Sequence, residues 1–263
     1  MRTVFTFTVL LTLAALPIFA QGPQALDRDS WSGPIAPGSS IRVENHFGDV
    51  RLRHGGSEGN LEVAAILQQL SIDGSKLTLE VDITADATSV TIVRYDLEGN
   101  PAPQVPRNDK ARADLAIMVP EGFFTRAETN RGLIEARDVR TDIDLHTTSG
   151  TIRIAKHHGR ITAHSETGPM EITLLPSATK KTQEFSSTTG QITVFTPATN
   201  DLDVAMATSG AFITDFSLKV EHHGTEEPNK TATTSIGGGG PTLKMTSKRG
   251  DLALRRVVTA DTK

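Results

Sequence analysis

Three side chains at equivalent positions could form a surface row with metal-binding chemistry. Glu128, His146 and His164 each stand four residues before one of three regularly spaced glycines. Each follows a residue that the apolar alternation directs inward, so all three are predicted to face solvent. If the segments stack in register, neighbouring members of the row lie about 4.8 Å apart, and zinc accepts imidazole and carboxylate ligands.

The alternative for this row is a ladder of polar side chains in water. The next positions along the chain, Ser186 and Met206, do not continue the row as metal ligands. We therefore predict no cofactor and no metal site, and keep the row as a hypothetical zinc site only.

Two pairs of aspartates are the best candidates for catalysis. Asp142 with Asp144, and Asp201 with Asp203, are two residues apart and would share an outward strand face. Polysaccharide-cleaving enzymes on β-helices need clustered carboxylates for calcium or for acid and base roles. Solvated strand faces have the same pattern, so we predict no catalytic residue and keep a carbohydrate-active enzyme as the alternative.

Other chemistries find no support in the sequence. There is no cysteine, which excludes disulfides, thiolate metal sites and cysteine nucleophiles. His157 and His158 are adjacent, so on a strand they would point to opposite faces and could not easily share a metal; we predict that they are turn residues. The formal net charge of −4 offers no basic field for nucleic acid.

A recurring glycine indicates which elements position these side chains. It returns after 18 to 22 residues, each time followed by a short apolar alternation, at Gly132, Gly150, Gly168, Gly190 and Gly210, with related copies at Gly48 and Gly250. Such a period is typical of stacked coils. We predict an all-β chain that forms a single β-solenoid with coils of about 18–22 residues.

The glycines are expected at turn positions with φ > 0, where a Cβ would be strained. After each turn, alternate apolar side chains should point into the core. The predicted core positions are Ile152, Ile154, Ile161, Met170, Ile172, Ile192, Val194, Leu252 and Leu254.

The chain divides into four predicted segments. Residues 1–20 have one early positive charge, a short apolar core and Ala20 before Gln21, as in a signal peptide. Residues 21–38 are rich in Pro and Gly and are predicted to be an extended linker. The solenoid is expected over 39–258, with long loops near 97–112 and 221–241, and residues 259–263 form a C-terminal tail.

The chain resembles the bacterial family of unknown function that is labelled putative adhesin. The resemblance rests on the strand Leu115–Val119 followed by Pro-Glu-Gly, on the recurring Thr-Ser-Gly-x-Ile-x-Ile units, and on the Gly-rich close from Gly237 into Gly250. It implies a β-helix-like fold and an exported or membrane-tethered location, and it carries no shared active site. Lys248-Arg249 and the Pro-rich insertion after Leu97 depart from the family pattern.

These observations favour an exported, non-enzymatic β-solenoid that acts as a cell-envelope binding, adhesive or structural module. Its expected partner is another macromolecule or a cell-envelope polysaccharide, and neither nucleic acid nor membrane integration after processing is expected. The expected location is periplasmic, outer-surface-associated or secreted. An envelope-stress sensor or scaffold partner is a second alternative.

Overall fold

Alternating apolar and polar residues form strands along the whole described chain. The computed structural model describes residues 25–56, 59–69, 75–102, 111–175 and 181–257, and every regular element in these ranges is a β-strand. The prediction of an all-β chain is therefore confirmed. Accordingly, no helix of the length and hydropathy that membrane crossing requires occurs in these ranges.

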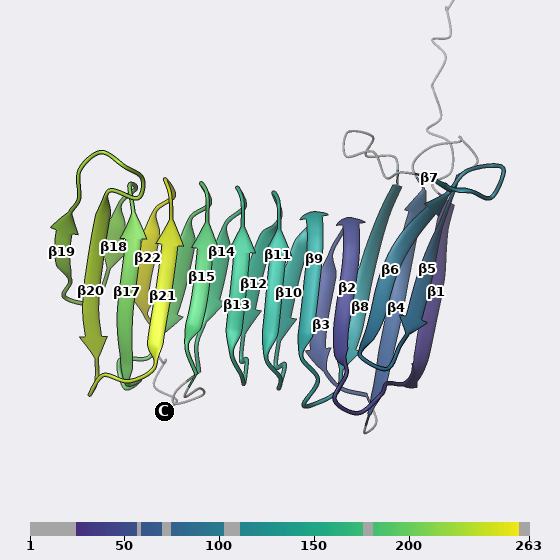
Figure 1. Ribbon diagram of the computed structural model, residues 1–263, viewed down its shortest axis with the longest axis horizontal. Coiled ribbons are helices and arrows are strands. Elements are labelled where there is room, and N and C mark those ends of the chain that lie inside the picture. Colours follow the sequence, from purple (N-terminus) through teal and green to yellow (C-terminus); the bar gives the residue numbers. More distant parts are fainter. Residues whose placement is uncertain (1–24, 57–58, 70–74, 103–110, 176–180, 258–263) are drawn as a thin grey trace, which may run out of the picture.

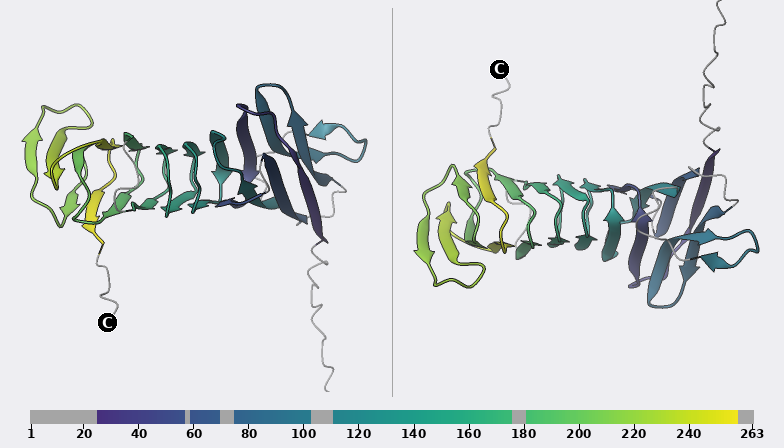
Figure 2. Two further views of the ribbon diagram at one scale, coloured as in Figure 1. Left: turned by 90° about the horizontal axis from the view of Figure 1, so that it is seen from below. Right: turned by 90° about the horizontal axis from the view of Figure 1, so that it is seen from above.

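Two large mixed sheets face each other along the long axis of the molecule (Figures 1 and 2). The ten-stranded sheet contains, in spatial order, β1 (Ala25–Pro34), β4 (Asn60–Gln69), β8 (Ala111–Val119), β3 (Val50–His54), β10 (Leu133–Arg137), β12 (Thr151–Ala155), β14 (Met170–Thr173), β16 (Ile192–Thr196), β22 (Leu252–Arg256) and β18 (Phe212–Thr214).

The twelve-stranded sheet lies opposite. It contains, in spatial order, β19 (Lys219–His222), β20 (Lys230–Ile236), β17 (Leu202–Thr208), β21 (Thr242–Ser247), β15 (Gln183–Ser187), β13 (Ile161–Ser165), β11 (Ile143–Thr147), β9 (Thr125–Arg131), β2 (Ser40–Phe47), β6 (Ala87–Tyr95) and β5 (Lys76–Ile83), with β7 (Pro101–Ala102) beside β6.

In the middle of the molecule the chain alternates between the two sheets. From β9 to β18, each strand of one sheet is followed by a strand of the other, and from β9 to β16 successive strands within a sheet pair in parallel. We call one strand from each sheet, such as β11 with β12, a rung. Ile143 pairs with Ile161 and Ile134 with Ile152, so neighbouring rungs are in register at a spacing of 18 residues.

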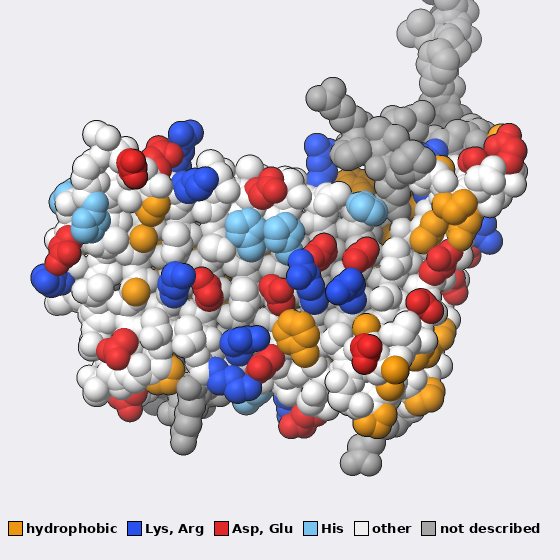
Figure 3. Space-filling view, in the orientation of Figure 1, with side chains coloured by type: hydrophobic (Ala, Val, Ile, Leu, Met, Phe, Trp, Pro, Cys, Tyr) orange, Lys and Arg blue, Asp and Glu red, His pale blue; other side chains and the backbone are white. Residues whose placement is uncertain are grey.

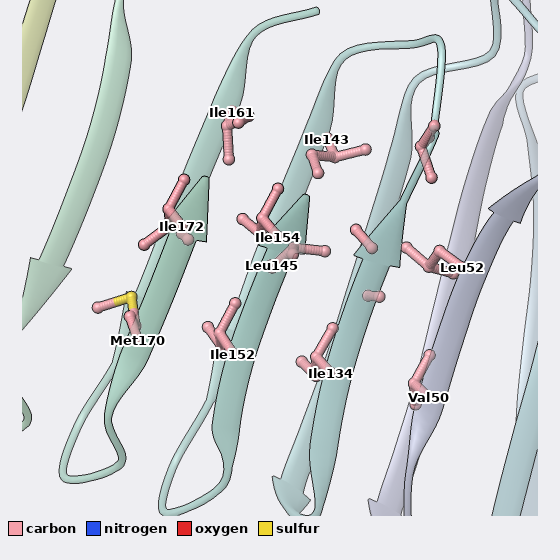
Figure 4. Packing of buried hydrophobic residues seen from close by; sticks show 14 of the residues in the cluster. Val50, Leu52, Ile134, Ile143, Leu145, Ile152, Ile154, Ile161, Met170 and Ile172 are labelled. Atoms are coloured by element: carbon pink, nitrogen blue, oxygen red, sulfur yellow. The ribbon is translucent and has the colours of Figure 1, made fainter. Parts of the chain in front are cut away.

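The predicted core positions all lie between the sheets. Each of the nine is at most 2% exposed, so the prediction of the core is confirmed. Equivalent residues of successive rungs form continuous rows in the ten-stranded sheet, such as Val50, Ile134, Ile152 and Met170 (Figure 4). Ile192 continues this row.

The glycines recur because neighbouring rungs approach each other closely. A Cβ on Gly150 would overlap the carbonyl oxygen of Gly132, and a Cβ on Gly168 would overlap that of Gly150. Gly150 and Gly168 are not among the residues with positive φ, whereas Gly132 has φ +141°. The expected explanation by φ > 0 is therefore wrong for Gly150 and Gly168, where backbone proximity excludes a side chain.

Buried hydroxyl groups three residues before these glycines close the same turns. The backbone N–H of Gly150 donates to Thr147 Oγ1 at 2.9 Å, and that of Gly190 donates to Ser187 Oγ at 2.7 Å. Ser165 occupies the equivalent position in the rung between them, but its Oγ has no hydrogen-bond partner among the described residues.

Two segments differ from the expected linker and loop. Within the predicted linker at residues 21–38, Ala25–Pro34 forms β1, which pairs with β4 over all ten positions. Within the predicted loop at 221–241, β20 pairs with β17 and with β19. Both strands contain few buried apolar residues, since β1 lies at a sheet edge and only Ala232 and Ile236 of β20 are buried. The alternation of apolar and polar residues therefore gives little indication of either strand.

The last rung along the chain is not the last rung in space. β21 lies between β15 and β17, and β22 lies between β16 and β18. Gly250 therefore stacks on Gly190, and Gly210 comes after it. The predicted signal peptide (1–20) and the predicted tail (259–263) lie outside the described residues.

Candidate functional surface

The outward face of the twelve-stranded sheet carries the row that the sequence predicts. His146 pairs with Glu128 on one side and with His164 on the other, in the expected register. The two imidazole rings are stacked, with centroids 5.0 Å apart and an interplanar angle of 19°. In Figure 3, histidine side chains are exposed on the middle of this face.

The row extends beyond its three predicted members. Glu44 pairs with Glu128 at one end, and Ser186 followed by Thr246 continues it at the other. Met206, expected as a later position, is instead buried at 2% exposure, because Ala207 rather than Met206 pairs with Thr246.

The three predicted members of the row already have partners within the sheet, since His146 stacks on His164. Arg126 donates to Glu128, and His164 Nδ1 lies 2.9 Å from Ser186 Oγ. Burial and the neighbouring His146 lower the pKa of His164 below its ordinary value, which favours a neutral ring. The described residues contain no group of three or more His, Asp or Glu side chains arranged to hold a metal ion, so the zinc hypothesis gains no support from this geometry.

The contact between Ser186 and His164 is one that sequence reasoning missed. A serine within hydrogen-bond distance of a histidine is the first requirement for a nucleophile with its base. Nucleophilic sites also need a third group that orients the base, and no hydrogen bond from His164 to a carboxylate occurs in the described part of the chain. We therefore assign Ser186 and His164 to the row of polar side chains and not to a catalytic site.

The four candidate aspartates are not brought together. Asp142 comes directly before β11, and Asp203 lies in β17. Three strands, β13, β15 and β21, lie between β11 and β17 in the sheet. Four strand spacings amount to about 19 Å, whereas the two carboxyl groups of a glycosidase lie roughly 5 to 10 Å apart.

Three of these carboxylates make hydrogen bonds that hold the local backbone or side chains. Asp142 accepts from Lys181 Nζ at 2.8 Å and from the backbone N–H of Arg160 at 2.9 Å. Although burial opposes ionisation, these bonds hold the pKa of Asp142 below its ordinary value. Asp201 accepts from the N–H of Gly238, and Asp203 accepts from Ser235 Oγ, both at 2.7 Å.

The remaining aspartate has a weaker partner. Asp144 lies 3.7 Å from Arg126 Nη1. The pKa of Asp142 is lowered, whereas a general acid needs a raised one.

His157 and His158 lie in the connector between β12 and β13, in agreement with their prediction as turn residues, but their exposure differs. His158 is exposed, but His157 is only 5% exposed and neither of its ring nitrogens has a hydrogen-bond partner among the described residues. Burial lowers the pKa of His157 to about 4. Aligning the rungs at the 18-residue spacing places His157 in the buried position of Val139, and that alignment is the signal that could have identified it.

A small cavity lies beside this imidazole. Leu174 and Leu175 line its apolar side, and Gln183 and Asn200 line its polar side. Gln183 Oε1 accepts from the N–H of Ile161 at 2.8 Å, and Asn200 Nδ2 donates to the backbone carbonyl oxygen of Leu175 at 3.1 Å. These amides therefore connect neighbouring rungs.

Comparison with known proteins found low sequence identity and partial structural similarity. No family model matches the chain, and no curated protein matches it. A solved structure described as a putative cell adhesion protein from Clostridium sporogenes is 14% identical, with a TM-score of 0.47 over 88% of this chain and 100% of the other. Structures described as putative adhesins from Bacteroides fragilis and Parabacteroides distasonis are each 10% identical, with TM-scores of 0.31 and 0.25. They cover 88% and 90% of this chain and 97% and 98% of their own.

Proposed function

We propose that residues 39–258 form a single β-solenoid that binds another macromolecule or cell-envelope polysaccharide through its outward faces, without catalysis. The register between rungs supports a solenoid, because equivalent residues recur at a fixed offset of 18 residues from β9 to β14. In such an architecture each rung contacts its neighbours, and the extended outer surface is the part available for binding.

The row from Glu44 to Thr246 is the observation that carries this proposal. It places six polar side chains, each about 4.8 Å from the next, across six adjacent strands. A regular polymer can make the same contact several times along such a row. Repeated weak contacts raise the overall affinity without any deep pocket.

The proposal includes export to the cell envelope. It rests on the apolar pattern of residues 1–20 and on the small residue before Gln21. An adhesive, structural or sensory module would need this location to meet envelope material.

Sedimentation with envelope material tests the proposed function. Mature protein from Gln21 onward is mixed with cell-wall polysaccharide isolated from the native host, and the bound fraction is measured over a range of polysaccharide concentrations. We expect saturable binding and no release of new reducing ends. Protein that stays in the supernatant with every envelope fraction would contradict binding, whereas release of reducing ends would favour the carbohydrate-active alternative.

The row offers a matched comparison in the same assay. The variant His146→Asn/His164→Asn changes two outward members of the row, while Thr151→Asn/Thr193→Asn changes two outward positions on the opposite sheet. Weaker binding by the first variant alone is expected if the twelve-stranded face is used. If both variants bind the polysaccharide equally weakly, the binding does not depend specifically on the twelve-stranded face.

A further inference from the structure

Two adjacent connectors between the sheets combine several unusual features. Residues 138–142 lead from β10 to β11, and residues 156–160 lead from β12 to β13. Arg137 pairs with Ala155 before the connectors, and Ile143 pairs with Ile161 after them. The connectors therefore lie side by side in register.

These connectors gather positive charge on an acidic chain. Arg137, Arg140, Lys156 and Arg160 are exposed at this margin, and we call these four residues the cationic ridge. In Figure 3, blue Lys and Arg side chains gather near the lower margin of the middle of the molecule, with red and pale-blue ones beside them. The formal charge of the whole chain is −4, so a local excess of cations here is opposite in sign to the rest.

The acidic groups of the connectors and of β10 are already paired, whereas Glu171 of β14, which lines the same outer side, forms no ion pair with a described residue. Asp142 binds Lys181, Asp138 lies 3.9 Å from Arg140, and Glu135 forms an ion pair with Arg53 at 2.9 Å. In contrast, Arg137, Lys156 and Arg160 form no ion pair with the residues that the structure describes. Their charges are therefore available to a ligand.

Local geometry also sets this margin apart. Lys156 has φ +53°, a conformation that a residue with a Cβ rarely adopts. Arg137, Arg153 and Lys156 line a shallow hollow of about 180 Å³ on the outer side of β10, β12 and β14, together with the carboxylates of Glu135 and Glu171. The strained backbone thus holds a lysine at the rim of a concave, solvent-exposed surface.

We propose that the cationic ridge binds an anionic polysaccharide whose carboxylates lie along its length. The inference rests on the proposed function and names the partner and the surface. One sugar residue is comparable in length to the ~4.8 Å spacing between rungs, so successive carboxylates can meet cations on both connectors. The two connectors, residues 138–142 and 156–160, contain no Phe, Tyr or Trp on which a nucleobase could stack, which favours a polysaccharide over single-stranded nucleic acid.

Calorimetry with polygalacturonate tests the inference, with neutral dextran of similar length as the control polymer. The ridge variant is Arg137→Gln/Lys156→Gln/Arg160→Gln. The control variant, Arg28→Gln/Lys76→Gln/Lys219→Gln, removes the same charge from exposed residues of β1, β5 and β19. We expect the ridge variant to bind at least about tenfold more weakly and the control to change by less than about twofold, with wild-type affinity falling as salt increases.

Three results would overturn the inference. They are absent binding of polygalacturonate by the wild-type protein, equal weakening in both variants, and equally tight binding of double-stranded DNA or of phosphatidylglycerol vesicles. Because all the substitutions are on the surface, equal thermal midpoints are expected and are measured alongside. If the ridge variant still sediments with host polysaccharide as wild type does, the ridge assignment fails while the proposed function stands; if wild type never sediments, the proposed function fails.

Discussion

Single glycines set the distance between rungs. The sequence shows their regular spacing, and the explanation expected for all of them was a turn position with φ > 0. At Gly150 the reason is the carbonyl oxygen of Gly132, which comes from the neighbouring rung and is invisible in a local sequence pattern. The register of His146 and His164 could be predicted because it depends only on the constant spacing of 18 residues.

The first prediction concerns this close approach. Gly150→Ala should destabilise the protein by at least about 2 kcal/mol, because the new methyl group meets a backbone oxygen that cannot move without shifting a rung. Gly238→Ala is the control, since its Cβ would lie 3.5 Å from the nearest atom, Asp201 Oδ1. Urea unfolding measures both, and similar midpoints for the two variants would contradict the account of the glycine row.

The second prediction compares two buried serines. Ser187→Ala leaves the buried N–H of Gly190 without its acceptor and should cost about 1–3 kcal/mol. Ser165→Ala removes a hydroxyl that has no partner among the described residues, so it should be neutral or stabilising. Because the two residues pair directly across β13 and β15, the comparison holds the surroundings nearly constant. A larger loss for Ser165→Ala would show that its hydroxyl has a partner after all.

The third prediction concerns the buried imidazole of His157. Its pKa of about 4 in the folded protein lies below the ordinary value of 6.5. The unfolded chain therefore binds a proton first, and stability that is present above pH 6.5 is lost as the pH falls towards 4. Between pH 7.5 and pH 5 this group alone should remove about 2 kcal/mol.

Replacement by the residue of the preceding rung isolates that contribution. His157→Val copies Val139, and its unfolding free energy should change less with pH than that of wild type. Urea midpoints at pH 7.5, 6 and 5 give the difference between the two proteins. Parallel pH profiles would mean that His157 does not titrate between its unfolded and folded values.

At the scale of strands, the sequence predicted the middle of the molecule better than its ends. Strands from β9 to β16 bury alternate apolar residues on one face, and period two is a reliable signal there. β1 was not predicted as a strand, because it lies at the edge of its sheet and its residues 26–30 are all exposed. The Pro and Gly residues around it also indicate a linker. Its pairing depends on β4, which no local pattern can reveal.

The free edge of β1 supplies the fourth prediction. Asp27 and Asp29 accept hydrogen bonds from the N–H groups of Arg28 and Ser30 at 2.9 and 2.8 Å, which occupies donors that another strand could use. Asp27→Ala/Asp29→Ala should free these donors and increase self-association. Analytical ultracentrifugation should detect larger species for this variant and not for Arg28→Ala/Ser30→Ala on the same strand. Two monomeric variants would indicate that the edge is protected in another way.

At the scale of the whole molecule, the spatial order of the rungs is what the sequence could not predict. The glycine period suggests that Gly210 stacks on Gly190, but Gly250 occupies that place. A repeat specifies the shape of each rung and not which neighbour it meets. The antiparallel pairs of β17, β20 and β19 carry the chain outward and back, so the final rung enters between two earlier ones.

This insertion makes the end of the chain essential to the stack. Phe185 and Val194 are fully buried, and their strands β15 and β16 pair with β21 and β22. In an array with sequential rungs, loss of the last one removes a single interface. Here, loss of β21 and β22 removes the interfaces on both of their sides and separates β17 and β18 from the rest.

The last prediction follows from these two interfaces. A chain that ends at Gly240 should lose cooperative thermal unfolding, and limited proteolysis should remove the region from β17 to β20 first. A chain that ends at Val257 keeps β21 and β22 and should unfold like the full chain. Circular dichroism and mass analysis of the proteolytic fragments measure both outcomes. If the chain ending at Gly240 unfolds cooperatively within a few degrees of the full protein, the inserted rung does not hold the end of the molecule together.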